Sequence, residues 1–184
     1  DSASRLIEPG SPSGAARVEA ARKCKEWGLP VRFKFKPMIP MLNWREEYAA
    51  MIDRIFSRAR PESLGFCVLM WMSFEDLQAR IGLELLDPEF VTAARDAAGD
   101  LKDVRTGPFP HEKRKEVYRF LIREIRKHDE TIPLYISTES REMWAELADE
   151  LGQKPGTFIC GCNPIEAPGP RMMPSRQLAT STYR

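Results

Sequence analysis

Residues 31–36 read Val-Arg-Phe-Lys-Phe-Lys, and this run stops at Pro37-Met-Ile-Pro40. Successive side chains of a β-strand point to opposite faces of a sheet. The alternation therefore predicts a strand that is apolar on one face and basic on the other. The apolar face holds Val31, Phe33 and Phe35, and the basic face holds Arg32, Lys34 and Lys36.

Helix and strand patterns alternate along the chain. Apolar runs at 64–72 and 132–137 predict two further strands, and the stretch 5–17 looks helix-like. Helices are also predicted from Ser11 or Ser13 to Gly28, at 44–58 after Asn43, at 74–86, 88–98 and 111–128, and from Thr138 or Ser140 to Gly152. This alternation indicates an α/β fold with a parallel sheet and outer helices. Three strands are too few for a complete eight-stranded TIM-type barrel, so a partial (β/α) barrel is expected.

The composition is that of an ordinary globular protein. The 184 residues are 42% hydrophobic and 30% charged, with a formal net charge of +1. No apolar run approaches the ~20 residues that cross a bilayer, so no membrane association is expected. The cysteine spacing suggests no disulfide framework, which favours a reducing, cytoplasmic setting. We expect one domain at 1–165, a flexible tail at 166–184, and missing sequence upstream.

The basic face of the 31–36 strand is the first candidate site. In a barrel the apolar face meets the outer helices, so the three cations would line the lumen. A packed lumen does not tolerate three cations, so they need a wet cavity or an anionic ligand. Arg32, Lys34 and Lys36 are therefore candidate substrate-binding residues. The alternative is an edge strand with a solvated basic face.

Several short phrases lie between residues 4 and 164. They are Arg5-Leu-Ile-Glu-Pro9, Ser11-Pro-Ser13, Arg17, Gly28, Pro37-Met-Ile-Pro40, Asn43-Trp44, Leu86-Asp-Pro-Glu-Phe90, Gly107-Pro-Phe109, Tyr135-Ile-Ser-Thr-Glu-Ser140 and Trp144. Together they resemble the C-terminal portion of the barrel of radical S-adenosylmethionine (SAM) enzymes, nearest the spore photoproduct lyase-like branch.

The resemblance implies a SAM site formed by Glu8, Arg17, Met38 and Ile39. Glu8 and Arg17 fall where the family's barrel approaches SAM, and a guanidinium suits the carboxylate of that cofactor. The Pro37-Met-Ile-Pro40 turn, which contains Met38 and Ile39, would supply apolar contacts or backbone groups to the adenine. Arg17 could instead be an exposed residue in the first turn of its helix. Glu8 could instead be a rim carboxylate that pairs with Arg5 or Lys34.

The same resemblance implies an enzyme, such as a lyase, that cleaves SAM reductively and abstracts hydrogen from its substrate. The family holds a [4Fe–4S] cluster on a Cys-x-x-x-Cys-x-x-Cys loop. That spacing does not occur in this sequence. The cluster ligands are expected upstream or on a partner chain, and this chain alone should be inactive.

Two cysteines, Cys160 and Cys162, form a second metal-binding candidate. Two thiolates one residue apart could bind zinc or an auxiliary cluster, but further ligands are required. The available imidazoles are those of His111 and His128. The alternative is a pair of reduced thiols in a loop. Cys67 could donate hydrogen inside a barrel, although a small buried side chain is the simpler interpretation.

The predicted helix at 111–128 is rich in cations and could contact a phosphate backbone. Glutamates alternate with these cations at helical spacing, which favours an ordinary solvated face. Small-molecule and nucleic-acid substrates both stay open. Two other classes remain possible: a non-catalytic α/β partner or scaffold domain, and an unrelated α/β enzyme for an anionic substrate. No Gly-rich phosphate loop supports the second of these.

Overall fold

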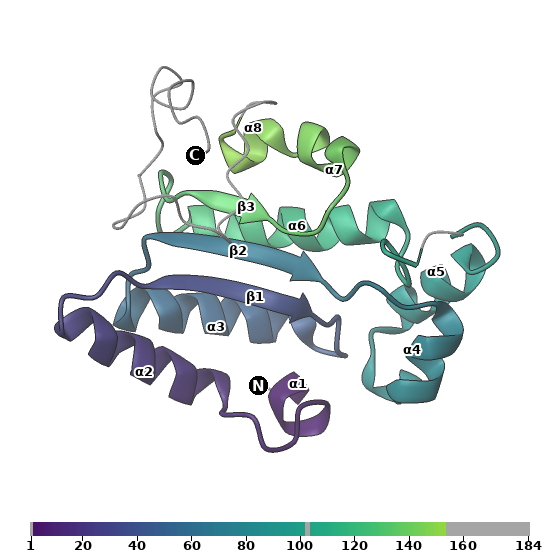
Figure 1. The fold of residues 1–184 in the computed structure, drawn as a ribbon, viewed down its shortest axis with the longest axis horizontal. Helices are drawn as coiled ribbons and strands as arrows, with labels where there is room; N and C mark the ends of the chain where they lie inside the picture. Colours follow the sequence, from purple (N-terminus) through teal and green to yellow (C-terminus); the bar gives the residue numbers. More distant parts are fainter. Residues whose placement is uncertain (1, 102–103, 154–184) are drawn as a thin grey trace, which may run out of the picture.

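The computed structural model describes residues 2–101 and 104–153, and its centre is a parallel sheet. The strands are β1 (Arg32–Met38), β2 (Ser63–Val68) and β3 (Leu134–Ile136), in the order β1-β2-β3 (Figure 1). The predicted α/β class with a parallel sheet is confirmed. The strand predicted to reach residue 72 ends at Val68, because the chain then turns away and Met70 bridges to Pro108.

Helices surround the sheet and match most of the predicted segments. They are α1 (Ser2–Leu6), α2 (Gly14–Glu26), α3 (Trp44–Arg58), α4 (Phe74–Arg80), the 3₁₀ helix η1 (Leu83–Leu85), α5 (Pro88–Ala97), α6 (His111–Arg126), α7 (Arg141–Glu146) and α8 (Ala148–Leu151). Figure 1 places α4 and α5 beyond the carboxyl ends of the strands. Within the described residues, no helix has both the length and the apolar character that a bilayer crossing demands.

Three predicted helices differ from the observed ones. The helix-like stretch 5–17 is two helices, because the chain turns at Gly10 with φ of +90° and α2 starts only after Ser13. The predicted helix at 74–86 breaks at Ile81, whose backbone is extended. The final predicted helix divides at Leu147 into α7 and α8.

Side-chain caps define several helix starts. Ser13 accepts a hydrogen bond from the Ala16 amide at the start of α2, and Ser140 accepts one from Met143 at the start of α7. Ser140, and not Thr138, is thus the cap of that helix. Asn43 precedes α3 as predicted, but its side chain makes no capping hydrogen bond. Caps of this kind satisfy backbone amides that have no partner inside the helix.

One face of the sheet is apolar and is packed against α3 and α6. In-register rows place Phe33 beside Leu64 and Phe35 beside Phe66. The ring of Phe35 lies edge-on to that of Tyr48 in α3, with 5.7 Å between ring centres. Figure 1 shows α3 and α6 on the same side of the sheet. The apolar alternation of β1 thus determines which face the helices cover, as the sequence predicts.

Candidate functional site

The opposite face of the sheet carries Lys34 in its middle row. In this row Lys34 pairs with Gly65, and Gly65 pairs with Tyr135. The Tyr135 ring lies across Gly65 so closely that a Cβ atom on Gly65 would overlap it. The Lys34 ammonium lies 5.9 Å from the centre of the same ring. A cation at this distance is attracted to the face of an aromatic ring.

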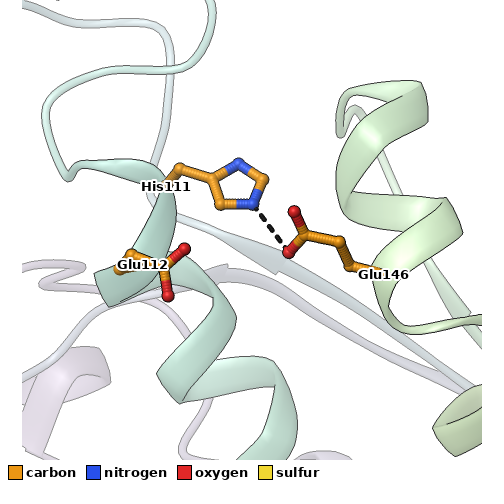
Figure 2. A group of neighbouring side chains, drawn as sticks. All are labelled: His111, Glu112 and Glu146. Atoms are coloured by element: carbon orange, nitrogen blue, oxygen red, sulfur yellow. Dashed lines mark hydrogen bonds and ion pairs between the residues drawn. The ribbon is translucent and has the colours of Figure 1, made fainter.

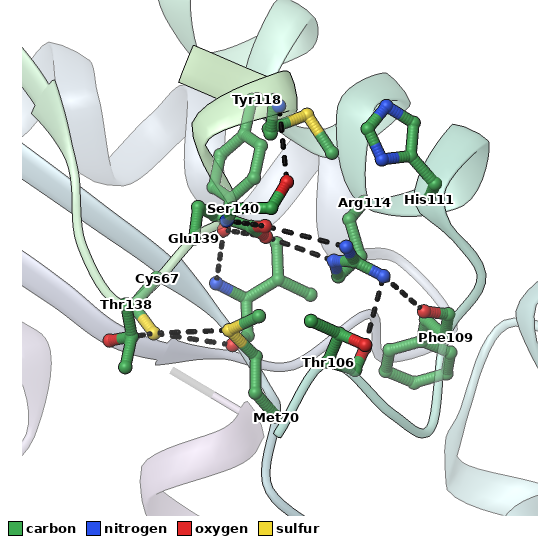
Figure 3. Close-up of polar contacts among 12 residues, drawn as sticks. Cys67, Met70, Thr106, Phe109, His111, Arg114, Tyr118, Thr138, Glu139 and Ser140 are labelled. Atoms are coloured by element: carbon green, nitrogen blue, oxygen red, sulfur yellow. Dashed lines mark hydrogen bonds and ion pairs between the residues drawn. The ribbon is translucent and has the colours of Figure 1, made fainter. Parts of the chain in front are cut away.

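Lys36 lies at the carboxyl end of the same face. Its ammonium donates a hydrogen bond of 3.3 Å to Oγ1 of Thr138, the second residue after β3. The Cys67 sulfur is 3.4 Å from the same oxygen and 3.8 Å from the sulfur of Met70 (Figure 3). Thr138 holds a φ of +68°, which costs energy for a β-branched residue. Ligands of α/β proteins bind at this edge of the sheet, so Lys36, Thr138 and Cys67 form a candidate site.

The third predicted cation, Arg32, lies at the opposite end of β1. Its guanidinium is 3.9 Å from the carboxylate of Glu62, which precedes β2. The strand direction separates Arg32 from the carboxyl edge of the sheet. Of the three candidate substrate-binding residues, Lys34 and Lys36 are therefore closest to the site.

The predicted SAM contacts Glu8 and Arg17 bind each other. Nη2 of Arg17 is 3.2 Å from Oε2 of Glu8; Arg17 is exposed and Glu8 is partly exposed. They line a cavity of about 170 Å³ between β1, α2 and α3, together with Lys34 and Lys36. The predicted convergence of Glu8 with two of the cations is therefore present in the geometry. Contact of either residue with SAM stays a prediction.

Ile39 and Met38 have different surroundings. Ile39 lines the same cavity, and its amide donates a 3.1 Å hydrogen bond to the Tyr48 hydroxyl oxygen. Burial raises the pKa of Tyr48 to about 12. The Met38 side chain is buried in the hydrophobic core and does not line the cavity. Of the two predicted adenine contacts, only Ile39 offers its side chain to the cavity.

A buried ion pair lies close to the carboxyl edge, and sequence reasoning missed it. Nε of Arg114 in α6 is 2.9 Å from Oε1 of Glu139, and the Tyr118 hydroxyl donates to the same oxygen at 2.9 Å (Figure 3). The Arg114 guanidinium also donates to the carbonyls of Thr106 and Phe109. Burial, and then the charge of Glu139, raises the pKa of Tyr118 well above its usual value.

The expectation that Arg114 belongs to a solvated basic face is wrong. Position 114 falls on the same stripe as Val117, Tyr118 and Leu121, which face the core. The sequence could have revealed this burial, because Arg114 is three and four residues from Val117 and Tyr118. Residues at these separations share one face of a helix. Arg126 also departs from the expectation, because its guanidinium is half-buried and donates to the carbonyls of Ile132 and Leu151. Four other cations of α6 pair with glutamates, as the expectation says. These pairs are Lys113–Glu116, Lys115–Glu112, Arg119–Glu150 and Lys127–Glu124.

His111, Glu112 and Glu146 gather where α6 faces α7 (Figure 2). Nε2 of His111 is 3.0 Å from Oε2 of Glu146. The Lys115 ammonium binds both carboxylates, at 2.6 Å from Glu112 and 2.9 Å from Glu146. Hydrogen bonds from His111 and then Lys115 lower the pKa of Glu146 to about 2. The ammonium already supplies the positive charge that a metal ion would bring, so the cluster is an ion-pair network.

His111 and His128 cannot both serve one metal at Cys160 and Cys162. His111 begins α6 and His128 lies two residues beyond its end, so they are roughly 25 Å apart for 17 residues at helical rise. Nε2 of His128 is 2.8 Å from a carboxylate oxygen of Asp53. Cys160 and Cys162, like the predicted tail, lie outside the described residues. Their metal-binding role stays a prediction.

Comparison with known proteins places the chain in no family. No family model matches it, and neither a curated protein nor a solved structure is a significant match.

Proposed function

We propose that this chain is the C-terminal part of a radical SAM-type (β/α) barrel and binds substrate on the face of its sheet that carries Lys34 and Lys36. The observation that supports the proposal is that the two faces of β1 carry different kinds of side chain. Phe33 and Phe35 face the side of α3 and α6, whereas Lys34 and Lys36 belong to the other face. A barrel with outer helices and a wet lumen demands that arrangement. The resemblance of short phrases such as Arg5-Leu-Ile-Glu-Pro9 to spore photoproduct lyase-like enzymes supplies the reaction class.

The two cofactors of the family, the iron–sulfur cluster and SAM, need groups that this chain supplies only in part. The sequence has no Cys-x-x-x-Cys-x-x-Cys segment, so the chain does not supply the ligands of a [4Fe–4S] cluster. The cavity beside Arg17 measures about 170 Å³, below the roughly 300 Å³ at which ligand pockets begin. Arg17 is moreover engaged by Glu8. A SAM site at Glu8 and Arg17, like the reductive cleavage of SAM, would therefore need groups from elsewhere.

The role left to this chain is to hold an anionic part of the substrate. Lys36 is exposed, and its ammonium donates to a neutral hydroxyl, that of Thr138, which an incoming phosphate or carboxylate could replace. Lys34 lies two residues earlier on the same face. Hydrogen bonds from an ammonium to an anionic oxygen are stronger than those to a neutral one. Substrate anions would thus bind at the carboxyl edge, near Cys67 and Thr138.

The reaction class can be tested with the natural protein that contains this chain. After anaerobic reconstitution with iron and sulfide and reduction with dithionite, it should release 5′-deoxyadenosine from SAM. The 184-residue chain treated in the same way should stay colourless, because it lacks the cysteine triplet. Absence of 5′-deoxyadenosine from a cluster-loaded natural protein would refute the proposal. A brown 184-residue chain would instead make Cys160 and Cys162 cluster ligands.

A second candidate is an α/β enzyme or scaffold domain that binds an anion without radical chemistry. The position of Lys36 at the carboxyl edge, with Lys34 two residues earlier on the same face, favours it equally. Lys36→Glu should weaken binding of inorganic phosphate in both cases, with little change in melting temperature, because Lys36 is exposed. The release of 5′-deoxyadenosine decides between the two candidates.

A further inference from the structure

Two large apolar side chains are exposed in the turn that joins α2 to β1. Trp27 is 74% exposed and Leu29 is 52% exposed. The turn consists of Trp27-Gly28-Leu29-Pro30, is exposed throughout, and is named the apolar tip. Its backbone is fixed, because Gly28 holds a φ of +77° and the Leu29 amide donates to the Cys24 carbonyl at 3.0 Å. Exposed apolar side chains that lie together commonly mark a surface for a protein or a membrane.

Cations lie beside the apolar tip. Figure 1 shows the carboxyl ends of α2 and α3 near the start of β1, at the left of the view. The Lys25 ammonium joins the two ends, since it donates to the Arg60 carbonyl at 2.6 Å. Exposed cations gather here, and none forms an ion pair with a described residue: Lys23, Lys25, Arg58 and Arg60.

The carboxylates of α2 near the tip are already bound. Arg22 binds both Glu19 and Glu26 on its own helix. The hydrogen bond from Arg22 lowers the pKa of Glu19, and the charges of Lys23 and Arg58 lower it further. Cations of α2 and α3 thus act on the same carboxylate, which Arg22 holds within α2.

Other carboxylates at the amino end of the sheet are paired or farther away. Glu62 lies 3.9 Å from Arg32, and Asp53 lies 2.8 Å from Nε2 of His128. The acidic residues 129–130 precede β3, the strand farthest from β1 in the sheet. Around the ends of α2 and α3 the cations therefore outnumber the carboxylates, and the apolar tip carries a positive surroundings.

We infer that the amino end of the sheet docks on a bilayer that contains anionic lipids, with Trp27 and Leu29 inserted among the headgroups. Binding of a protein to a bilayer surface grows with the apolar area that it buries and with the attraction of its cations to anionic lipids. The amphipathic ring of tryptophan favours the interface between lipid and water. Cations in the last turn of a helix also stabilise its dipole, but that role does not explain the exposure of the apolar tip.

The aliphatic half of the tip selects a bilayer over a nucleic acid. Cations attract both, and bases stack on aromatic rings such as that of Trp27. Leu29 has no ring, and its side chain gains free energy when it leaves water for an apolar environment. The expectation of no membrane association considered only segments that cross a bilayer, and a surface contact needs none.

The inference does not rest on radical chemistry. The candidate site at Lys36 and Thr138 lies at the carboxyl edge, so a bilayer at the amino end of the sheet would leave it open. Docking can fail while SAM is still cleaved, and it can occur when SAM is not.

The test sediments the natural protein that contains this chain with vesicles of phosphatidylcholine, alone or mixed with an equal part of phosphatidylserine. The protein should sediment with the mixed vesicles only, and high salt should weaken binding. Trp27→Ala/Leu29→Ala should weaken binding by about tenfold or more, because the apolar tip is lost. Trp71→Ala/Leu42→Ala removes equally exposed side chains elsewhere and should leave binding unchanged.

A second pair of variants tests the cations. Lys23→Glu/Arg58→Glu should weaken binding to the mixed vesicles by about tenfold or more, because each lost cation near the surface weakens the attraction. Arg80→Glu/Arg95→Glu makes the same charge change at exposed positions of α4 and α5 and should keep binding. Equal melting curves of all the variants would show that they are folded.

Tryptophan quenching separates insertion from loose electrostatic attraction. Phosphatidylcholine with brominated acyl chains, mixed with phosphatidylserine, should quench tryptophan emission. Trp27→Phe keeps an apolar ring, so it should still sediment but lose most of that quenching. Equal binding to both kinds of vesicle, no binding, or binding without quenching would overturn the inference. A single-stranded oligonucleotide that binds where vesicles do not, and that Trp27→Ala/Leu29→Ala releases, would assign the surface to nucleic acid and would also overturn it.

Discussion

Arg114 and Glu139 form an ion pair that is buried at both ends, with side-chain exposures of 3% and 0%. The pair connects α6 to the loop that follows β3. The Tyr118 hydroxyl donates to the same carboxylate and accepts a 3.1 Å hydrogen bond from the Val68 amide at the end of β2. Three segments that meet at the carboxyl edge of the sheet are thus fixed relative to one another. The candidate site around Lys36 and Thr138 lies beside this network.

Glu139→Ala should lower the free energy of unfolding by about 3–5 kcal/mol, because it leaves the Arg114 charge buried and unpaired. Urea denaturation monitored by circular dichroism measures the change. The matched control is Glu124→Ala, which breaks the exposed pair with Lys127 and should cost less than about 1 kcal/mol. Equal losses in the two variants would show that the Arg114–Glu139 pair is solvated in solution.

Replacing both partners should be milder than replacing one. Arg114→Met/Glu139→Leu removes both charges and restores apolar packing, so it should recover a large part of the stability lost in Glu139→Ala. The Tyr118 hydroxyl loses one acceptor in both variants, which makes the comparison fair. A double variant no more stable than Glu139→Ala would mean that the hydrogen bonds of Arg114 to Thr106 and Phe109 matter more than the ion pair.

Gly65→Ala should destabilise the sheet by about 1–3 kcal/mol, because the new methyl group overlaps the ring of Tyr135. Thermal melting gives the shift. Adding Tyr135→Ala removes the overlap, so the double variant should lose less than the sum of the two single variants. Gly99→Ala is the control, since nothing lies within 4 Å of a Cβ at that position. Strictly additive losses at Gly65 and Tyr135 would contradict the close contact.

Stability should fall in alkaline solution as Tyr48 ionises. Burial raises its pKa from 10.0 to about 12, so the folded protein favours the neutral phenol. The contribution of Tyr48 to the free energy of unfolding is fully present below pH 10. It falls by up to about 3 kcal/mol as the pH rises toward 12. Tyr48→Phe should flatten the curve of unfolding free energy against pH in that window. Tyrosinate absorbance that develops with a midpoint near pH 10 for every tyrosine would refute the burial.

Acid should weaken the contact between α6 and α7. His111 and then Lys115 lower the pKa of Glu146 from 4.5 to about 2, so the folded state favours the carboxylate. This contribution is present above pH 4.5 and is lost as pH falls toward 2. Glu146→Gln should show a smaller change in unfolding free energy across that window, measured by urea denaturation at several pH values. Glu142→Gln on the same helix should behave like the original chain.

Periodic patterns in the sequence predicted the local part of the fold. The alternation at 31–36 predicted both the strand and the face that meets the helices, because side-chain direction in a strand is fixed by position alone. Helical spacing likewise predicted α3 over the residues it occupies, Trp44–Arg58. The predicted start of α2 at Ser13 is confirmed. The break at Ile81 was missed, because the extended backbone of this residue interrupts a segment that spacing alone would continue.

The amino-acid sequence by itself determined the two-faced strand, the parallel α/β class and the cations at Lys34 and Lys36. Tertiary structure alone decided which charges meet: Arg17 with Glu8, and Arg114 with Glu139. It also laid Tyr135 across Gly65. Periodicity depends on neighbours within a few residues, so it can be read along the chain. Partners 25 or 70 residues apart are chosen by how the helices and strands pack, and no spacing in the sequence encodes that choice.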